Sequence, residues 1–314
     1  MEFVHRPVLL TECMDGLNIK KDGVYVDGTV GGGGHSLGIV STLGKQGKLV
    51  CIDQDEEALE KAKDAINKKN INDAKVIFEK SNFENLTNVC ENLGIKSVDG
   101  ILLDIGVSSY QLDNPKRGFS YNNDAVLDMR MNASESLNAE IILNEWPRED
   151  LLKIIRDYGE EKWASRIAKF ICEARDKKRI ETTFELVDIV KAAIPKKARQ
   201  TGPHPAKRVF QAIRIAVNDE LGVLTRVIDK GVELLSKEGR FCIITFHSLE
   251  DRLVKQGFSQ MVNPCKCPGS FPMCICGKEP KAKLVSKKPI IPTVKEIDTN
   301  PRSRSAKLRI LEKV

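Results

Sequence analysis

One stretch near the start of the chain constrains the fold more than any other. Residues 24–36 form an apolar strand ending in Asp27, then a loop with four consecutive glycines, then the first turn of a helix. Because glycine has no Cβ, such a loop can adopt positive φ and bring its amide groups close to a ligand at the helix N-terminus. A second apolar strand, residues 48–52, leads into Asp53, whose carboxylate can accept hydrogen bonds from both hydroxyls of a ribose. Together these features predict a site for a nucleotide-like cofactor.

Two common glycine motifs are excluded by the residues at their key positions. A phosphate-binding P-loop needs Gly-Lys followed by Ser or Thr, but residues 44–46 read Gly-Lys-Gln and Ile39 stands where the first glycine belongs. The dinucleotide fingerprint fails because its third glycine falls on Ser36 or Leu37. The remaining pattern of acid, glycine loop and acid is typical of enzymes that use S-adenosylmethionine (SAM). An ordinary glycine-rich turn in an α/β domain is the alternative.

Length and composition narrow the class of protein. A chain of 314 residues predicts either one large domain with an insertion or two domains. No apolar run approaches the length of a membrane span, and the N-terminus lacks a signal-peptide core. Nine scattered cysteines, an odd number, indicate reduced thiols. We therefore expect a cytoplasmic protein that does not associate with membranes.

The order of elements predicts a parallel sheet covered by helices on both faces. Expected strands occupy 24–27, 49–53, 75–78 and 98–104, and expected helices occupy 36–43, 56–69 and 84–93. In open α/β sheets, ligands bind beyond the carboxyl ends of the strands. Asp27, Asp53 and Asp104 each end such a strand, so we expect all three to converge on one crevice.

A helical insertion interrupts this alternation. The segment from 106 to 131 has little periodicity, and we expect it to be functional or disordered. Residues 138–194 show helical periodicity, and a basic segment with three prolines follows at 195–205. Beyond it we expect one long helix with an apolar face reaching Leu224, a strand at 241–246, a helix capped by Ser248, and a closing strand at 306–313. We assign residues 1–112 and 206–314 to the sheet domain, and 113–205 to an inserted, mainly helical, substrate-recognition domain.

Several motifs together resemble one known family. They lie at 27–29, 33–35, 103–109, 117–120, 128–131, 158–161, 204–206, 246–252 and 300–305, and so extend along most of the chain. In these segments the sequence resembles the ribosomal RNA small subunit methyltransferase H family, also called the MraW family. The resemblance implies a Rossmann-like class I SAM-dependent methyltransferase domain carrying an inserted all-helical domain. It also implies N4-methylation of one cytidine in the decoding region of 16S rRNA, within the small ribosomal subunit.

The resemblance also implies which residues contact the cofactor. They are Gly33, Gly34, His35, Asp53, Phe83, Asp104 and Gln111. Phe83 could lie against an adenine ring or belong to the core. His35 and Gln111 each have a structural alternative, as a cap or a loop brace. Asp104 has the strongest individual case, because an acid at a strand end beside a glycine has little structural reason to be there.

Methyl transfer to cytosine N4 requires alignment and a proton acceptor, since the nitrogen lone pair is delocalised into the ring. Many amino-methyltransferases place Asp/Asn-Pro-Pro-Tyr after the fourth strand, whereas residues 104–107 here read Asp-Ile-Gly-Val. We therefore expect Asp104 and Ser108 near the target amino group as the catalytic candidates. His247 is a second candidate, with a capping role as its alternative.

Basic clusters predict contact with RNA phosphates, although solvated basic faces are common. The candidates are Lys196, Lys197, Arg199, Lys207, Arg208, Arg302 and Arg304. A target cytosine must be unstacked before its amino group can reach the methyl donor. We expect the partner to be 16S rRNA within the small ribosomal subunit, with a homodimer as a further option.

Four cysteines gather late in the chain, at positions 265, 267, 274 and 276. Four thiolates can hold zinc, but the usual ligand pairs leave at least two residues between them, and here there is one. A reduced loop is the alternative, and we assign no metal from the sequence. Three rival functions stay open: a nicotinamide-dependent oxidoreductase, a small-molecule methyltransferase, and a SAM-binding ribosome-assembly factor that acts through RNA binding alone.

Overall fold

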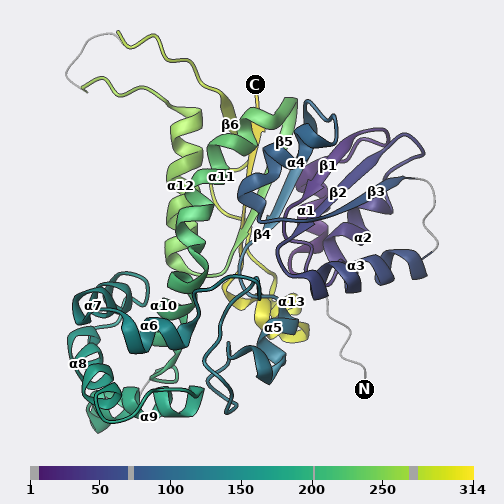
Figure 1. Ribbon diagram of the computed structural model, residues 1–314. Coiled ribbons are helices and arrows are strands. Elements are labelled where there is room, and N and C mark those ends of the chain that lie inside the picture. The colour runs from purple at the N-terminus through teal and green to yellow at the C-terminus, as the bar shows by residue number, and fades with distance from the viewer. Residues whose placement is uncertain (1–6, 70–73, 201, 269–274) are drawn as a thin grey trace. The chain divides into compact units, whose positions relative to one another are not determined.

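A computed structural model describes residues 7–69, 74–200, 202–268 and 275–314, and it divides the chain into two compact units (Figure 1). Met1–Gly106 with Leu221–Val314 form the sheet unit, and Val107–Glu220 form the helical unit. These boundaries differ from the expected ones at 112/113 and 205/206. The later boundary moves because Val209, Phe210 and Ile213 are buried in the same core as the other helices of the helical unit.

The sheet unit contains a seven-stranded sheet in the order β3-β2-β1-β4-β5-β7-β6. The strands are β1 (Val24–Asp27), β2 (Lys48–Asp53), β3 (Lys75–Lys80), β4 (Val98–Asp104), β5 (Leu235–Thr245), β6 (Ala282–Leu284) and β7 (Lys307–Lys313). The first five in spatial order are parallel, and β7 pairs antiparallel with both β5 and β6. This topology confirms the predicted Rossmann-like α/β fold.

Alternating side chains on the strands bury both faces of the sheet. Val26, Ile101 and Phe241 lie in one apolar cluster, with residues of α4 (Leu86–Asn92), α11 (Glu220–Leu234) and α12 (Ser248–Val262). Tyr25 and Leu102 point into the opposite cluster, with residues of α1 (Leu10–Leu17), α2 (Gly34–Val40) and α3 (Glu56–Lys68). Buried parallel strands need apolar residues on both faces, which explains why these runs are almost continuously hydrophobic.

The remaining short elements of the sheet unit are η1 (Phe83–Asn85), α13 (Val294–Thr299) and η4 (Pro301–Ser305). Within the described ranges, no helix combines the length and apolar character needed to cross a membrane.

The helical unit packs its amphipathic helices around one apolar core. Its elements are α5 (Ser109–Asp113), η2 (Pro115–Arg117), α6 (Ala139–Glu145), α7 (Arg148–Asp157), α8 (Ala164–Arg175), α9 (Thr183–Ala193), η3 (Lys196–Arg199) and α10 (Lys207–Asn218). Ile155, Ile167 and Leu186 are fully buried members of that core. The observed helices confirm the helical periodicity of this part of the sequence.

The segment expected to be functional or disordered is fixed by hydrogen bonds within the helical unit. Gly118 has φ +68°, and a Cβ there would overlap the carbonyl oxygen of Val126. The Asn218 amide donates to the Met129 carbonyl at 2.8 Å and accepts from the Met131 amide at 2.8 Å. The loop is therefore part of the folded structure of this unit.

Two expected helix boundaries are wrong. The long helix breaks at Asp219, whose φ of 46° is left-handed, so α10 and α11 are separate helices. The N-cap of α12 is His247 rather than Ser248. The His247 ring accepts the Glu250 amide while the Glu250 carboxylate accepts the His247 amide, which makes a capping box.

Candidate functional site

The glycine loop between β1 and α2 shows which glycines the fold requires. Gly33 has φ +78°, and a Cβ there would lie 2.9 Å from the Cα of Ala62. A Cβ on Gly34 would overlap Pro7. A Cβ on Gly32, in contrast, would meet no atom of the described residues within 4 Å. Packing and conformation explain Gly33 and Gly34, whereas the backbone at Gly32 faces open space.

Asp27, at the end of β1, is fully buried and closes the loop onto α2. One carboxylate oxygen accepts the Ser36 hydroxyl at 2.6 Å, and the other accepts the Thr29 amide at 3.2 Å. Burial raises the pKa of Asp27, and the hydrogen bonds oppose that shift. Both oxygens of Asp27 therefore already have partners inside the fold.

Asp53, at the end of β2, joins this strand to the glycine loop. Its Oδ2 accepts the Gly31 amide at 2.8 Å, and its Oδ1 accepts the Asp55 amide at 2.9 Å. Burial raises the pKa of Asp53 to about 6, against the opposing effect of these two bonds. Since each carboxylate oxygen can accept a second hydrogen bond, Asp53 retains capacity for a ligand.

Asp104, at the end of β4, has a hydrogen-bonded backbone amide and a carboxylate oxygen without a partner among the described residues. Its backbone amide donates to Thr29 Oγ1 at 2.6 Å, and its Oδ2 lies 3.6 Å from His35 Nδ1. Its Oδ1 is buried and has no hydrogen-bond partner among the described residues. Burial raises the pKa of Asp104 to about 6; His35 lowers it, and Asp27 and Glu250 raise it further. Because nearly all buried polar atoms have partners, this oxygen is an acceptor available to a ligand or a water.

His35 lies on the first turn of α2 and is 5% exposed. Its Nε2 donates to the carbonyl oxygen of Val8 at 2.9 Å. A neutral imidazole carries one proton, so this bond leaves Nδ1 without a hydrogen on the side facing Asp104. Nδ1 therefore offers a lone pair on the side of Asp104 Oδ2, 3.6 Å away.

Phe83 opens η1 after β3 and lies beside the end of β1. A Cβ on Gly28 would be 3.2 Å from the Phe83 Cβ, so the two residues are neighbours. Phe83 is partly buried and packs against one face of the sheet core. The ring therefore has a packing role, and its exposed part is compatible with contact to a flat base.

Ser108 and Gln111 belong to the helical unit, where they form the capping box of α5. The Gln111 amide donates to Ser108 Oγ at 3.2 Å, and Gln111 Oε1 accepts the Ser108 amide at 3.1 Å. These bonds give both residues a local structural role. Their roles in catalysis and cofactor binding stay predictions.

Glu250 is a buried acid that the sequence reasoning did not single out. Its Oε2 accepts the Phe246 amide at 2.8 Å and the His247 amide at 3.2 Å. Its Oε1 lies 3.0 Å from His247 Nε2, yet both atoms are buried without a well-aligned hydrogen bond in the described part of the chain. An acid three residues after a capping candidate was the available signal.

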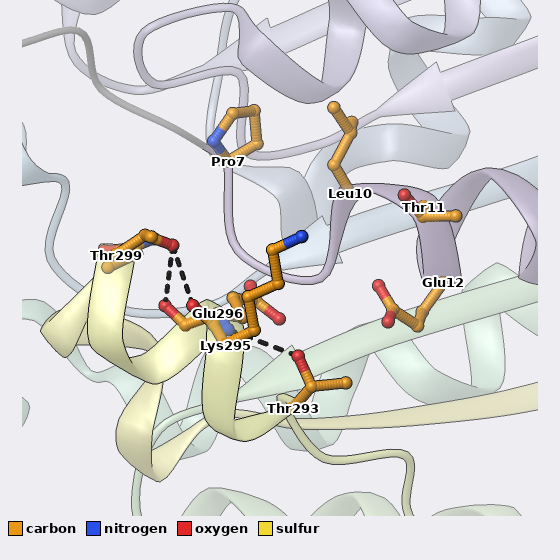
Figure 2. A pocket seen from close by; sticks show the side chains of 9 residues that line it. Pro7, Leu10, Thr11, Glu12, Thr293, Lys295, Glu296 and Thr299 are labelled. Carbon is orange, nitrogen blue, oxygen red and sulfur yellow. Dashed lines mark hydrogen bonds between the residues drawn. The ribbon is translucent and has the colours of Figure 1, made fainter.

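A separate hollow of about 460 Å³ lies between α1 and α13 in the sheet unit (Figure 2). It is lined by Pro7, Leu10, Thr11, Glu12, Thr293, Lys295, Glu296, Thr299 and Asn300. Glu296 Oε1 accepts the Leu9 amide at 2.7 Å, which ties α13 to the start of α1. None of the predicted site residues lines this hollow.

The predicted phosphate-binding residues occupy both units. Lys196 and Lys197 are exposed on η3, and Arg302 and Arg304 are exposed on η4. Arg208, on α10, donates to the carbonyl oxygen of Glu160 at 2.9 Å and lies 3.9 Å from the Glu161 carboxylate. Arg208 therefore has a structural contact in addition to any role in RNA binding.

Comparison with known proteins gives matches along the whole chain. Residues 2–314 match the MraW methylase family. Ribosomal RNA small subunit methyltransferase H of Ruminiclostridium cellulolyticum is 57% identical over 315 residues, with 100% of both chains covered. The proteins of the same name from Acetivibrio thermocellus and Clostridioides difficile are 60% and 54% identical over 314 residues, again with 100% of each chain covered.

Proposed function

This chain belongs to the MraW methylase family, and on this premise we propose that it methylates small-subunit ribosomal RNA, at the exocyclic N4 of a cytidine in the decoding region of 16S rRNA. It is a methyltransferase with a Rossmann-like fold, and its methyl donor is SAM. The observation that carries the proposal is the orphaned Oδ1 of Asp104 at the edge where β1, β2 and β4 end.

The residues at the strand ends fit SAM. Asp53 retains acceptor capacity for ribose hydroxyls, and the backbone at Gly32 is open to a ligand. The adenine ring would lie against the exposed part of Phe83. Gly33, Gly34 and His35 fix the loop and the first turn of α2 behind these contacts. We also propose Gln111, in the helical unit, as a cofactor contact.

SAM, when bound, supplies an electrophilic methyl group on its sulfonium sulfur. The protein must then hold the cytosine amino group in line with that methyl and accept a proton from N4. In this proposal the orphaned Oδ1 of Asp104 faces SAM, and its other oxygen, Oδ2, is the proton acceptor that we assign. A carboxyl with a pKa of about 6 is mostly ionised at neutral pH yet basic enough to take a proton. His35 Nδ1 is placed to share that proton. Ser108 is the second catalytic candidate.

The RNA target has to present an unstacked cytosine. Lysines on η3 and arginines on η4 would each contact RNA phosphates. The glycine loop and the strand-end acids have no RNA role in this proposal. Phosphate contacts position the RNA, and contacts to the base determine which nucleotide is methylated.

The test is incubation of the protein with SAM and small ribosomal subunits from cells that lack the enzyme, followed by quantification of N4-methylcytidine by mass spectrometry. We expect one new N4-methylcytidine, located in the decoding region by fragment mapping. SAM binding and RNA binding without product would instead support the assembly-factor alternative. Product at another nucleotide would overturn the assigned target but not the methyltransferase activity.

A further inference from the structure

Three thiols converge in the segment that links α12 to β6, outside the residues assigned to cofactor and RNA. The Sγ atoms of Cys265, Cys267 and Cys276 all lie within 4.8 Å of one another. Cys274, the fourth cysteine of the sequence cluster, lies outside the described residues.

The described parts of this segment have no regular secondary structure and no buried side chain. Residues 263–268 and 275–280 contain no helix or strand, and each of their side chains is at least partly exposed. Ile275, the one large aliphatic side chain among them, is 75% exposed. Short segments without a core usually depend on a metal ion or a disulfide for a defined structure.

The backbone nevertheless brings the cysteines back to one place. The Lys281 amide donates to the Met261 carbonyl at 2.9 Å, which joins the two ends of the segment. Gly277 follows Cys276 directly and has φ +63°, a left-handed conformation that glycine adopts without strain. The hydrogen bond between Lys281 and Met261 thus brings the two ends of the segment, and with them the three thiols, to one place.

We propose that Cys265, Cys267 and Cys276 bind a structural Zn²⁺ ion, with one further ligand completing a tetrahedron. Zinc–sulfur bonds of about 2.3 Å in tetrahedral geometry place sulfur atoms about 3.8 Å apart, so only small side-chain shifts are needed from the present separations. Thiolate sulfur is the ligand type that selects zinc over magnesium or calcium. A disulfide would use only two of the three thiols. The ion would cross-link a segment that has no core of its own.

The first experiment measures metal binding by the full-length, tag-free protein after removal of metals under reducing conditions. We expect one equivalent of Zn²⁺ by calorimetry, and thiolate charge-transfer absorption when Co²⁺ replaces it. Cys265→Ser, Cys267→Ser and Cys276→Ser should each weaken binding by more than the about 10–100-fold that outer-shell changes cause. Cys172→Ser is the matched control, since Cys172 is a partly exposed thiol on α8 of the helical unit.

A second readout separates metal binding from general misfolding. Zn²⁺ should slow tryptic cleavage after Lys266 and Lys278 in the wild type and in Cys172→Ser, but not in the other three variants. No stoichiometric binding by the reduced protein would overturn the proposal, as would equal affinity in all four variants. An intramolecular disulfide among these thiols in protein kept anaerobic would also overturn it. None of these outcomes depends on methyl transfer.

Discussion

A buried ion pair in the helical unit contrasts with two buried acids in the sheet unit. In the helical unit, Arg214 forms two hydrogen bonds with Glu220, at 2.7 and 2.8 Å, and both side chains are largely buried. In the sheet unit, Asp104 has a buried oxygen with no hydrogen-bond partner in the described structure, and Asp53 uses only part of its acceptor capacity. An unsatisfied buried polar atom costs about 1–3 kcal/mol. The Arg214–Glu220 pair thus defines structure in the helical unit, whereas Asp104 and Asp53 of the sheet unit keep acceptor capacity for a ligand.

The largest expected effect is on the stability of the helical unit. Arg214→Met leaves the Glu220 carboxylate buried without its partner, which should cost about 3–5 kcal/mol of unfolding free energy. Urea unfolding followed by circular dichroism measures the loss. The double change Arg214→Met with Glu220→Leu should recover most of that stability. A single variant as stable as the wild type would show that this pair is not structural.

In urea unfolding, the variant Asp104→Asn should gain stability relative to the wild type, whereas Arg214→Met loses it. Its folded pKa of about 6 lies above the ordinary value of 3.8, so the folded state binds the proton more tightly than the unfolded chain. The stability that the protonated carboxyl contributes is present below pH 3.8 and is lost as pH rises to about 6. Asp104→Asn resembles the protonated acid, so its stability relative to the wild type should rise across this window and then level off. A pH-independent difference would contradict the raised pKa.

Methylation should slow when Asp53 or Asp104 is replaced, but not when an acid at the opposite end of the strands is replaced. Asp53→Ala and Asp104→Ala remove charged acceptors of about 1.5–3 kcal/mol, which corresponds to about 10–150-fold slower methylation. Asp99→Ala is the control, because Asp99 lies near the start of β4 and pairs with Lys20 at 2.9 Å. Equal losses in all three variants would mean that the effect comes from the fold and not from the site.

Gly33 and Gly32 are neighbours, but we expect the first to affect stability and the second to affect SAM binding. Gly33→Ala places a Cβ against Ala62 at positive φ and should cost at least about 1–2 kcal/mol of stability. Gly32→Ala meets no described atom and should leave the melting temperature unchanged while weakening SAM binding. Thermal unfolding and calorimetry on the two variants test this. Unchanged SAM affinity in Gly32→Ala would remove that part of the loop from the proposed site.

The smallest effect should come from Ser108. Loss of this N-cap in Ser108→Ala should cost about 1 kcal/mol, measured by urea unfolding. Ser108→Asp keeps a capping oxygen, so it should retain stability. If the hydroxyl also takes part in catalysis, both variants should lose activity. Full activity in Ser108→Asp would restrict Ser108 to its capping role.

Much of the fold follows from the sequence because its signals are local. Buried parallel strands appear as apolar runs, and β1 and β4 begin and end at the predicted residues. The break at Asp219 was missed because it depends on tertiary contacts. Asn218 bonds to the loop at Met129 and Met131, and the ion pair between Arg214 and Glu220 spans the break. No periodicity in α10 encodes those contacts.

The sequence predicts which residues belong to the candidate site, but not which of their atoms stay without a hydrogen-bond partner. Two predicted parallel strands end in Asp53 and Asp104, which places both acids at one edge of the sheet. The structure confirms that β2 and β4 end at these residues. Which oxygen stays without a partner depends on distances of a few tenths of an ångström, as with the 3.6 Å between His35 Nδ1 and Asp104 Oδ2. The capping box of Ser108 and Gln111 was readable from the serine and the glutamine three residues later, but the catalytic interpretation took precedence.

Calorimetric titration of SAM into the wild type, Asp104→Asn and Asp99→Ala tests the central claim most directly, because it requires neither RNA nor turnover. The account predicts stoichiometric binding to the wild type and to Asp99→Ala. It predicts at least about tenfold weaker binding to Asp104→Asn, although that variant is at least as stable as the wild type at neutral pH. Equal SAM affinity in Asp104→Asn and the wild type would show that the orphaned oxygen does not face the cofactor, and it would contradict the proposed site.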